Sequence, residues 1–491
     1  MVQPTDPIKI LEISQMDWMK GISLQDTFPV GGIFQSSSYN FDPFETMGYL
    51  QPALASVQLD SAINKKPTAS VAMQGNGVGY VFMIADRTAS AAKNLFRIKV
   101  SDLTVTTYSL TGGNAVGARS FSGIGYFNGV LLFLDQANGF FYRTDISNAA
   151  ETIIATGISG NGANSVPPVF YTGADGNLYF TKTGSDGKIG KITTAFALTD
   201  GAFQGDSNLT PKDITGDGTY LIIAMDENPS QVSGINTKCQ IYYWDMDKAD
   251  ADLVQTIPDS YIVSARFVDG RLLVIGGSGI WQCGIGTNPR LIVPLTESQL
   301  PVSNQAVTIS GNIMSWVAGT SGQEYSYGAK IGKPILYSPF QSNQSAFNQT
   351  TLVASGNYHV VGVDDGASGG KAYISNTGSS RTNATVITAP NVLSIPFRFA
   401  YAKVTLKSKL TTGQAIDLIL QNSEGIEIKA SDTKSYSVSN PRRTFIFGPK
   451  KDSVQVEDFE DIVAQINPQG GAVVQRVVVY GTPLADYTEK S

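Results

Sequence analysis

The segment FNGVLLFLD, at Phe127–Asp135, joins an Asn-Gly turn directly to a hydrophobic strand, and this arrangement recurs along the middle of the chain. Four similar segments are GNGVGYVFMIAD, ADGNLYFTK, GDGTYLIIAMD and VDGRLLVIGG, which begin at residues 75, 174, 216 and 268. Two looser copies, SGNIMSWVAG and SGNYHVVGVDD, begin at residues 310 and 355. Asn-Gly and Asp-Gly pairs suit tight β-hairpin turns because both residues tolerate a positive φ. Each copy therefore predicts a hairpin.

The spacing of these hairpins predicts a β-propeller. The turn glycines are residues 77, 129, 176, 218, 270, 311 and 356, and their intervals average about 46.5 residues, the length of one four-stranded blade. The second unit is expected to hold strands at 120–126, 130–135, 140–145 and 152–156, and the fifth at 261–268, 271–276, 280–284 and 291–295. We expect six or seven blades over residues 48–390, with Gly48–Leu59 adding a strand to the last blade. A plain meander of hairpins is the alternative.

The composition agrees with an all-β protein and excludes several classes. Charged residues are only 15% of the 491 residues, 50 residues are glycine, and 42% are hydrophobic, which suits short strands and Gly-rich turns rather than surface helices or disorder. A net charge of −6 gives no basic field for nucleic acid. No apolar run is long enough to span a membrane, and residues 1–21 lack a signal-peptide pattern, so we expect synthesis in a cytoplasm.

The two ends of the chain differ from the repeats. Residues 1–47 carry scattered apolar residues without periodicity, and we expect an extended arm that packs outside its own fold; its large aromatic residues are Trp18, Phe28, Phe34, Phe41 and Phe44. Residues 391–491 show longer alternating segments, such as 400–407 and 416–421, with further strands at 443–447 and 473–480. Five to seven such strands predict a small β-sandwich.

Nucleophile and nucleotide motifs are weak in this sequence. Gly366–Gly370 has the G-x-S-x-G pattern around Ser368, but the only histidine, His359, precedes the serine and no strand-to-helix unit surrounds it. The motif is interpreted as a hairpin loop. Gly369-Gly370-Lys371 lacks the first glycine and the hydroxyl residue of a phosphate-binding loop. Cys239 and Cys283 are too few for a disulfide framework or a zinc knuckle, and nothing marks either as reactive.

Acidic and aromatic segments give the remaining candidates. The run Asp245–Asp252 has alternating carboxylates that could hold Ca²⁺, but it lacks the glycine and the final glutamate of a calcium loop, and an exposed blade-edge loop is favoured. The pairs Asp226-Glu227 and Asp364-Asp365 could act as glycosidase carboxylates only if they met across a cleft. The aromatic strands Ile241–Trp244 and Ile280–Cys283 are interpreted as core. No catalytic, cofactor-binding or metal-binding residue is therefore assigned.

The order of parts resembles the β-propeller virion proteins of tailed bacteriophages and related viruses. The resemblance covers the architecture of the whole chain, and in sequence it rests on MDWMKGIS (Met16–Ser23), NFDPFETMGYLQPA (Asn40–Ala53) and FAYAKVTLKSKLTTGQAIDLILQ (Phe399–Gln421). It implies a non-enzymatic component of the virus tail, in a nozzle, tip or ring. The implied partners are other virion proteins and copies of the chain in a symmetric ring, with a host-surface glycan as a further candidate. A glycan-binding or glycan-cleaving propeller is the alternative.

Overall fold

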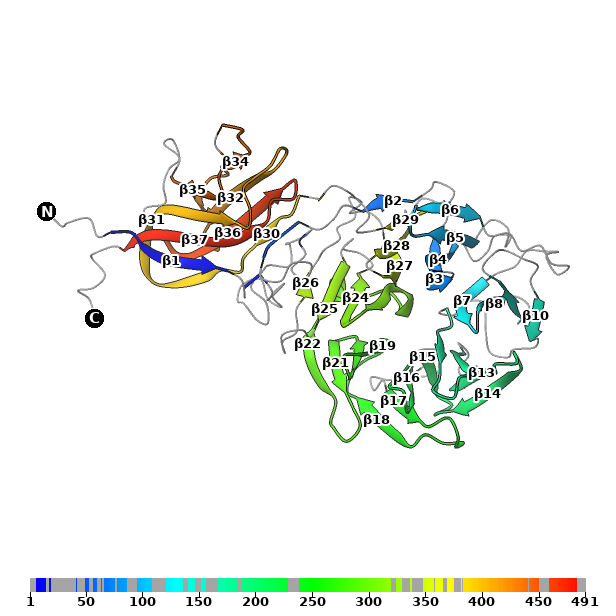
Figure 1. Ribbon diagram of the computed structural model, residues 1–491. Helices are drawn as coiled ribbons and strands as arrows, with labels where there is room; N and C mark the ends of the chain where they lie inside the picture. Colours follow the sequence, from blue (N-terminus) through cyan, green and yellow to red (C-terminus); the bar gives the residue numbers. More distant parts are fainter. Residues whose placement is uncertain are drawn as a thin grey trace. The chain divides into compact units, whose positions relative to one another are not determined.

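The computed structural model shows two all-β units, a seven-bladed propeller and a curled sheet formed largely by the C-terminal residues (Figure 1). It describes residues 6–14, 17–18, 41, 49–52, 56–59, 63, 66–75, 77–85, 95–107, 121–135, 140–145, 152–155, 167–182, 187–227, 238–318, 324–328, 336–337, 348–356, 358–364, 369–374, 381, 383–439, 441–449 and 459–483. Within these residues the helical elements are two short 3-10 turns, η2 (Glu297–Gln299) and η3 (Asn304–Ala306). No described helix is long and apolar enough to cross a membrane.

Seven four-stranded antiparallel sheets form the blades, which settles the choice between six and seven. Their strands are, for blade 1, β3 (Pro67–Gly75), β4 (Val78–Ala85), β5 (Leu95–Lys99) and β6 (Thr104–Thr107); blade 2, β7 (Phe121–Phe127), β8 (Val130–Asp135), β9 (Phe140–Thr144) and β10 (Thr152–Ala155); blade 3, β11 (Phe170–Thr172), β12 (Leu178–Thr181), β13 (Lys188–Ile192) and β14 (Leu198–Gln204); blade 4, β15 (Leu209–Gly216), β16 (Leu221–Glu227), β17 (Cys239–Trp244) and β18 (Leu253–Ile257); blade 5, β19 (Ile262–Val268), β20 (Arg271–Gly276), β21 (Gly279–Cys283) and β22 (Arg290–Pro294); blade 6, β23 (Val307–Ser310), β24 (Ile313–Val317), β25 (Glu324–Gly328) and β26 (Leu336–Tyr337); and blade 7, β27 (Asn348–Ser355), β28 (Tyr358–Asp364), β29 (Gly370–Ile374) and β2 (Val57–Gln58).

The repeated turn joins the first and second strands of every blade. All seven turn glycines have a positive φ, and an added Cβ would meet no atom within 4 Å at any of them, so it is the backbone conformation and not the available space that favours glycine. In blade 2, Asn128 has φ 47° and Gly129 has φ 83°, the pair of left-handed residues that a tight hairpin requires. The strand after each turn lies inside its blade and is mostly buried, as in β16 and β20. What repeats in the sequence is therefore the hairpin turn between the first and second strands of each blade.

Hydrophobic clusters seal neighbouring blades. One cluster joins blades 1 and 2 through Phe82 and Phe133, and another joins blades 4 and 5 through Tyr243 and Val274. Blades 2 and 3, and blades 3 and 4, share further clusters of the same kind. Each interface buries large apolar side chains. Removing apolar surface from water stabilises the folded state by about 25 cal/mol per Å², so packing against its neighbours stabilises each blade.

An N-terminal strand closes the ring. Val57 and Gln58 of β2 pair with Ile374 and Tyr373 of β29, as predicted for the segment Gly48–Leu59. Leu59 then donates its amide to the carbonyl oxygen of Ala372 at 2.8 Å and lies buried between blades 7 and 1. The last blade thus gains its fourth, outer strand from the other end of the propeller sequence, which joins the last blade to the start of the first.

The C-terminal unit is one curled nine-stranded sheet. Its strands are β1 (Ile8–Ile13), β30 (Val386–Ile387), β31 (Asn391–Leu406), β32 (Ala415–Gln421), β33 (Glu427–Lys429), β34 (Thr433–Ser435), β35 (Thr444–Phe447), β36 (Phe459–Gln469) and β37 (Val474–Pro483). The 16-residue strand β31 pairs with β36 near its start and with β37 and β35 farther along, so it belongs to both halves of the expected sandwich. Residues after 391 supply seven strands, and β1 and β30 come from outside the predicted boundary.

The expectation that the arm packs outside its own fold is wrong for the part that the structure describes. β1 pairs antiparallel with β37, from Ile8 opposite Gly481 to Ile13 opposite Val477. Trp18 is fully buried, and its indole nitrogen donates to the carbonyl oxygen of Gln475 at 2.9 Å. Phe41 is also buried, whereas Phe28, Phe34 and Phe44 lie outside the described residues. The described part of the arm pairs and packs with the C-terminal sheet, so it does not need a periodic apolar pattern of its own.

Candidate binding pocket of the propeller

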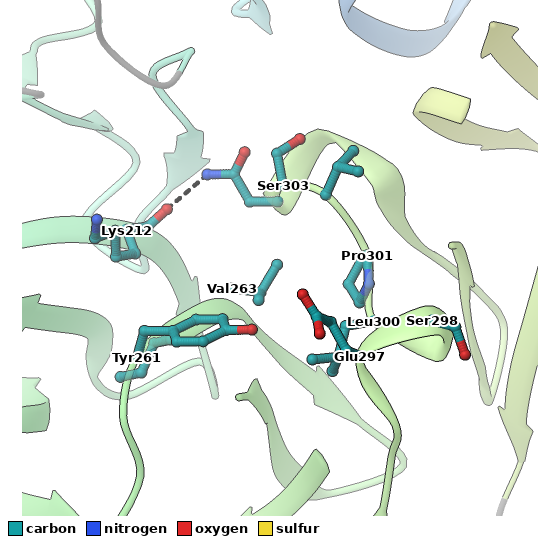
Figure 2. Close-up of a pocket in the computed structure, with 11 residues that line it drawn as sticks. Lys212, Tyr261, Val263, Glu297, Ser298, Leu300, Pro301 and Ser303 are labelled. Carbon is teal, nitrogen blue, oxygen red and sulfur yellow. Dashed lines mark hydrogen bonds between the residues drawn. The ribbon is translucent and has the colours of Figure 1, made fainter. Parts of the chain in front are cut away.

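A pocket of about 640 Å³ lies between blades 4 and 5 and the segment that leads into blade 6. We call it the Tyr261 pocket; its lining residues are Lys212, Tyr261, Ile262, Val263, Glu297, Ser298, Leu300, Pro301, Val302, Ser303 and Asn304. Figure 2 shows the Tyr261 ring and the Glu297 carboxylate extending toward the same space, with Val263 and Pro301 beside it and the Ser298 hydroxyl turned away. Its volume lies within the range of about 300–1,000 Å³ typical of small-molecule sites.

Hydrogen bonds fix the loop that forms one wall of this pocket. The side-chain oxygen of Gln299 accepts from the amide of Thr296 at 3.0 Å, which holds the turn η2. The carbonyl oxygen of Gln299 accepts from the indole nitrogen of Trp316 at 2.7 Å, and Pro301 forms a β-bridge with Ala318. The loop is thereby tied to β24, although it has little regular structure of its own.

Charges on the opposite wall are already paired. The Lys212 ammonium lies 3.1 Å from Oδ1 of Asp226, whose Oδ2 accepts from the amide of Ile262 at 2.9 Å. Burial raises the pKa of Asp226, and Lys212 opposes that effect. Burial also raises the pKa of Tyr261, so its hydroxyl stays protonated at neutral pH. Glu297 is exposed, and no ion pair is found for it among the described residues.

Asn304 forms part of the pocket floor and is 2% exposed. Its Nδ2 donates to the carbonyl oxygen of Lys212 at 2.6 Å, an assignment that fixes which side-chain atom is the oxygen. Its Oδ1 is buried and accepts no hydrogen bond from the described residues. A buried acceptor without a donor is costly, and its burial also keeps this atom from direct contact with a ligand.

A second cavity, of about 210 Å³, is lined by first strands from six of the seven blades and therefore lies at the centre of the ring. Arg266 and Asn304 both line this central cavity. The Arg266 guanidinium is paired with fully buried Asp213 of β15, and its Nη2 donates to the carbonyl oxygen of Asn304 at 3.1 Å. Blades 4 and 5 and the entry to blade 6 are thus joined by one buried charged network.

The two cysteines and the two aromatic strands belong to the core. Cys239 and Cys283 are buried, and burial raises the pKa of each to about 12. The strand β17, which contains Ile241–Trp244, is buried throughout, and Trp281 donates its indole N–H to Asp259 at 2.7 Å. The interpretation of both aromatic strands as core is confirmed. These side chains are positioned for packing rather than for contact with a ligand.

The candidate serine lies outside the described residues, and the described candidate carboxylates lie in different blades. Gly366, Ser368 and Asp365 lie outside the described residues, while His359 is half-buried on β28. Asp226 is in blade 4, and Asp364 is in blade 7, where it forms an ion pair with Lys66 at 3.0 Å. Blades 5 and 6 separate the two carboxylates in the ring, so they do not form a glycosidase pair.

The acidic run Asp245–Asp252 is a turn organised by its own lysine. The Lys248 ammonium lies 2.9 Å from Asp245 and also contacts Asp252. Hydrogen bonding to Asp252 raises the pKa of Lys248, and Lys248 lowers the pKa of Asp245. No group of three metal-binding side chains occurs in the described part of the chain. A lysine takes the position that a calcium ion would need, which fits the favoured interpretation as an exposed loop.

Sequence reasoning missed the Tyr261 pocket. Its residues lie between the repeats rather than in them, mainly in the stretch from Glu297 to Asn304. The available signal was the gap between the strand predicted to end at residue 295 and the turn at Gly311, which is longer than one strand requires. Such a gap predicts an extra loop but does not show what that loop faces.

Comparison with known proteins finds similarity among solved structures but not among protein families or curated sequences. No protein-family model matches the chain, and no curated protein matches its sequence. Among solved structures, the chain is similar to the Dos1 propeller, with a TM-score of 0.46 and 10% identity over 67% of this chain and 96% of that one. It is also similar to the computationally designed Ika8 protein, with a TM-score of 0.40 and 14% identity over 72% and 99% of the two chains. Structural similarity at 10% and 14% sequence identity gives no information about function.

Proposed function

We propose that this chain is a non-enzymatic structural protein of a virus particle, located in the tail as a nozzle, tip or ring component. In this proposal it is made in the host cytoplasm and assembles there with other virion proteins and with copies of itself around the tail axis. The observation that carries the proposal is the strand β1, which lies at one end of the strand order in the C-terminal sheet and, among the described strands, pairs with β37 alone.

An edge strand of this kind is suited to assembly. The edge of β1 away from β37 has no neighbour among the described strands, and such an edge accepts a strand from another chain through main-chain hydrogen bonds. Ile8, on this strand, is 47% exposed. The buried thiols and separated carboxylates support a binding role over a catalytic one, because they are engaged in structural contacts.

The test is incorporation into particles by a virus that lacks its own copy of this gene. Wild-type protein supplied in trans should be found in purified particles and should form symmetric oligomers by electron microscopy. Ile8→Lys places a charge on the exposed edge and should reduce incorporation. Val254→Lys, at a position 44% exposed on the outer strand β18, is the matched control and should incorporate normally.

Two results would refute the proposal. One is a purified particle that contains none of this protein by mass spectrometry. The other is full incorporation of Ile8→Lys, which would show that the β1 edge takes no part in assembly.

A further inference from the structure

We propose that the Tyr261 pocket binds a neutral saccharide without cleaving it. This inference goes beyond the assembly role and does not depend on it, because the pocket lies in the propeller and the assembly edge lies in the C-terminal sheet. The ligand class follows from three features of the pocket: an exposed aromatic ring, a carboxylate for which no ion pair is found among the described residues, and a floor fixed by hydrogen bonds.

The aromatic ring supplies a surface for the apolar face of a sugar. Tyr261 is 42% exposed although it is a large aromatic residue, and its ring faces the pocket that Val263 and Pro301 help to form (Figure 2). Sugar rings carry C–H groups on their faces and hydroxyls on their edges. A tyrosine matches both, because it has an apolar ring and a polar tip and loses little conformational freedom on binding.

The charge of the pocket favours a neutral ligand over an anionic one. The Lys212 ammonium is paired with Asp226 at 3.1 Å, so the pocket has no free cation among its lining residues. The Glu297 carboxylate is exposed and would repel a phosphate or an acidic sugar. Toward a neutral sugar the same carboxylate acts as a strong acceptor for hydroxyl donors, since hydrogen bonds to an ionised group are the stronger kind.

The floor of the pocket is held in place before any ligand arrives. Asn304 is fixed by its bond to Lys212, and its backbone oxygen is held by Arg266. A prearranged site loses less entropy on binding, so a small number of contacts can give measurable affinity.

Cleavage is not part of the inference, because it needs two carboxylates on either side of the bond. Glu297 is the exposed carboxylate that lines the pocket. The nearby Asp226 is 3% exposed and bonded to Lys212 and Ile262, so it cannot reach a sugar. The pocket has the groups to hold a saccharide and lacks the second group needed to hydrolyse it.

The experiment screens the full-length protein against an array of neutral and acidic oligosaccharides and measures the best neutral one by calorimetry. We expect binding to neutral members, and a loss of affinity of about tenfold or more for Tyr261→Ala, the scale of an aromatic anchor. Glu297→Gln should weaken binding less, and Tyr261→Phe should retain most of it because the ring face remains. Tyr401→Ala is the matched control, since Tyr401 stacks on Tyr480 in the C-terminal sheet.

Binding confined to acidic glycans, or no binding to any neutral oligosaccharide, would overturn the inference. So would a Tyr261→Ala variant that binds like the wild type, or a Tyr401→Ala variant that loses binding to the same extent. Any release of reducing sugar from a bound oligosaccharide would contradict the non-catalytic part. Particle incorporation of Tyr261→Ala, measured alongside, should be normal, which separates this inference from the proposed assembly role.

Discussion

Asp213 is the residue whose replacement should damage the propeller most. Its carboxylate is fully buried and accepts hydrogen bonds from the Ser264 hydroxyl at 2.7 Å and the Ala265 amide at 2.8 Å, both in blade 5. It also accepts from the Ile214 amide and pairs with Arg266. Asp213→Ala removes all of these acceptors at once and leaves a guanidinium at the centre of the ring without its counter-ion.

The expected loss follows from what remains buried. Removing one partner of a buried ion pair costs about 3–5 kcal/mol, because the other charge stays desolvated and unpaired. Arg266 keeps its bonds to the carbonyl oxygens of Asn304 and Val307, which places the estimate toward the lower end of that range. At about 2 °C per kcal/mol for a domain this large, a loss of about 3–4 kcal/mol should lower the melting temperature by about 6–8 °C.

The assay measures the free energy of unfolding by calorimetry and by urea unfolding. It compares the wild type with Asp213→Ala, Arg266→Met and the double variant. The double variant should be more stable than the sum of the two single losses implies, with a coupling of about 1–3 kcal/mol. Lys238→Ala is the control: it breaks an ion pair with Asp206 at which both side chains are partly exposed, and it should shift the melting temperature little. A loss below about 1 kcal/mol for Asp213→Ala, or strict additivity, would refute the reasoning.

Three further predictions concern the core, the closure and the turns. Because burial raises the pKa of Cys239 and Cys283 to about 12, neither thiol should react with Ellman's reagent at pH 8 in the native protein, and both should react in guanidinium; a fast native reaction would contradict their burial. Leu59→Ala should destabilise the seam between blades 7 and 1 by about 2–5 kcal/mol and increase light scattering on heating, and unchanged melting would argue against closure by β2. Gly129→Ala should cost about 1–2 kcal/mol in urea unfolding, because Gly129 has φ 83°, while Gly448→Ala, which meets no neighbouring atom, should be neutral; equal effects would exclude turn strain as the cause.

Local patterns explain why the propeller could be predicted. The strands expected at 130–135 and 271–276 match β8 and β20 at both ends, because a left-handed Asn-Gly or Asp-Gly turn fixes where the strand after it begins. Other ends of these two blades differ by one residue, as in β22, which begins at Arg290 and ends at Pro294 rather than spanning 291–295. The blade count was left at six or seven because the last two copies were degenerate in sequence, yet Gly311 and Gly356 adopt the same positive φ as the others.

Long-range pairings explain what could not be predicted. Ile8 of β1 pairs with the distant residue Gly481, and β2 has only two residues. Neither strand can therefore be recognised from an alternation of apolar and polar residues in its own sequence. The Tyr261 pocket is assembled from β15, the start of β19 and the loop before β23, and its chemistry depends on Lys212 being paired rather than free. A sequence pattern shows which residues alternate along a strand, but it does not show which distant charges neutralise each other.

The pairings of β1 and β2 mean that the N-terminal segment joins both units late in folding. β1 completes an edge of the C-terminal sheet and β2 completes the last blade, so one segment contributes a strand to each unit. Both strands must wait for residues made much later, since β29 ends at Ile374 and β37 begins at Val474. Closing loops of this length costs little more than closing shorter ones, because the entropy grows only with the logarithm of length, but such non-local contacts form slowly. Until they form, the edges of β29 and β37 stay open to pairing with another chain, and once they form the outermost strands are β2 in the last blade and β1 in the C-terminal sheet.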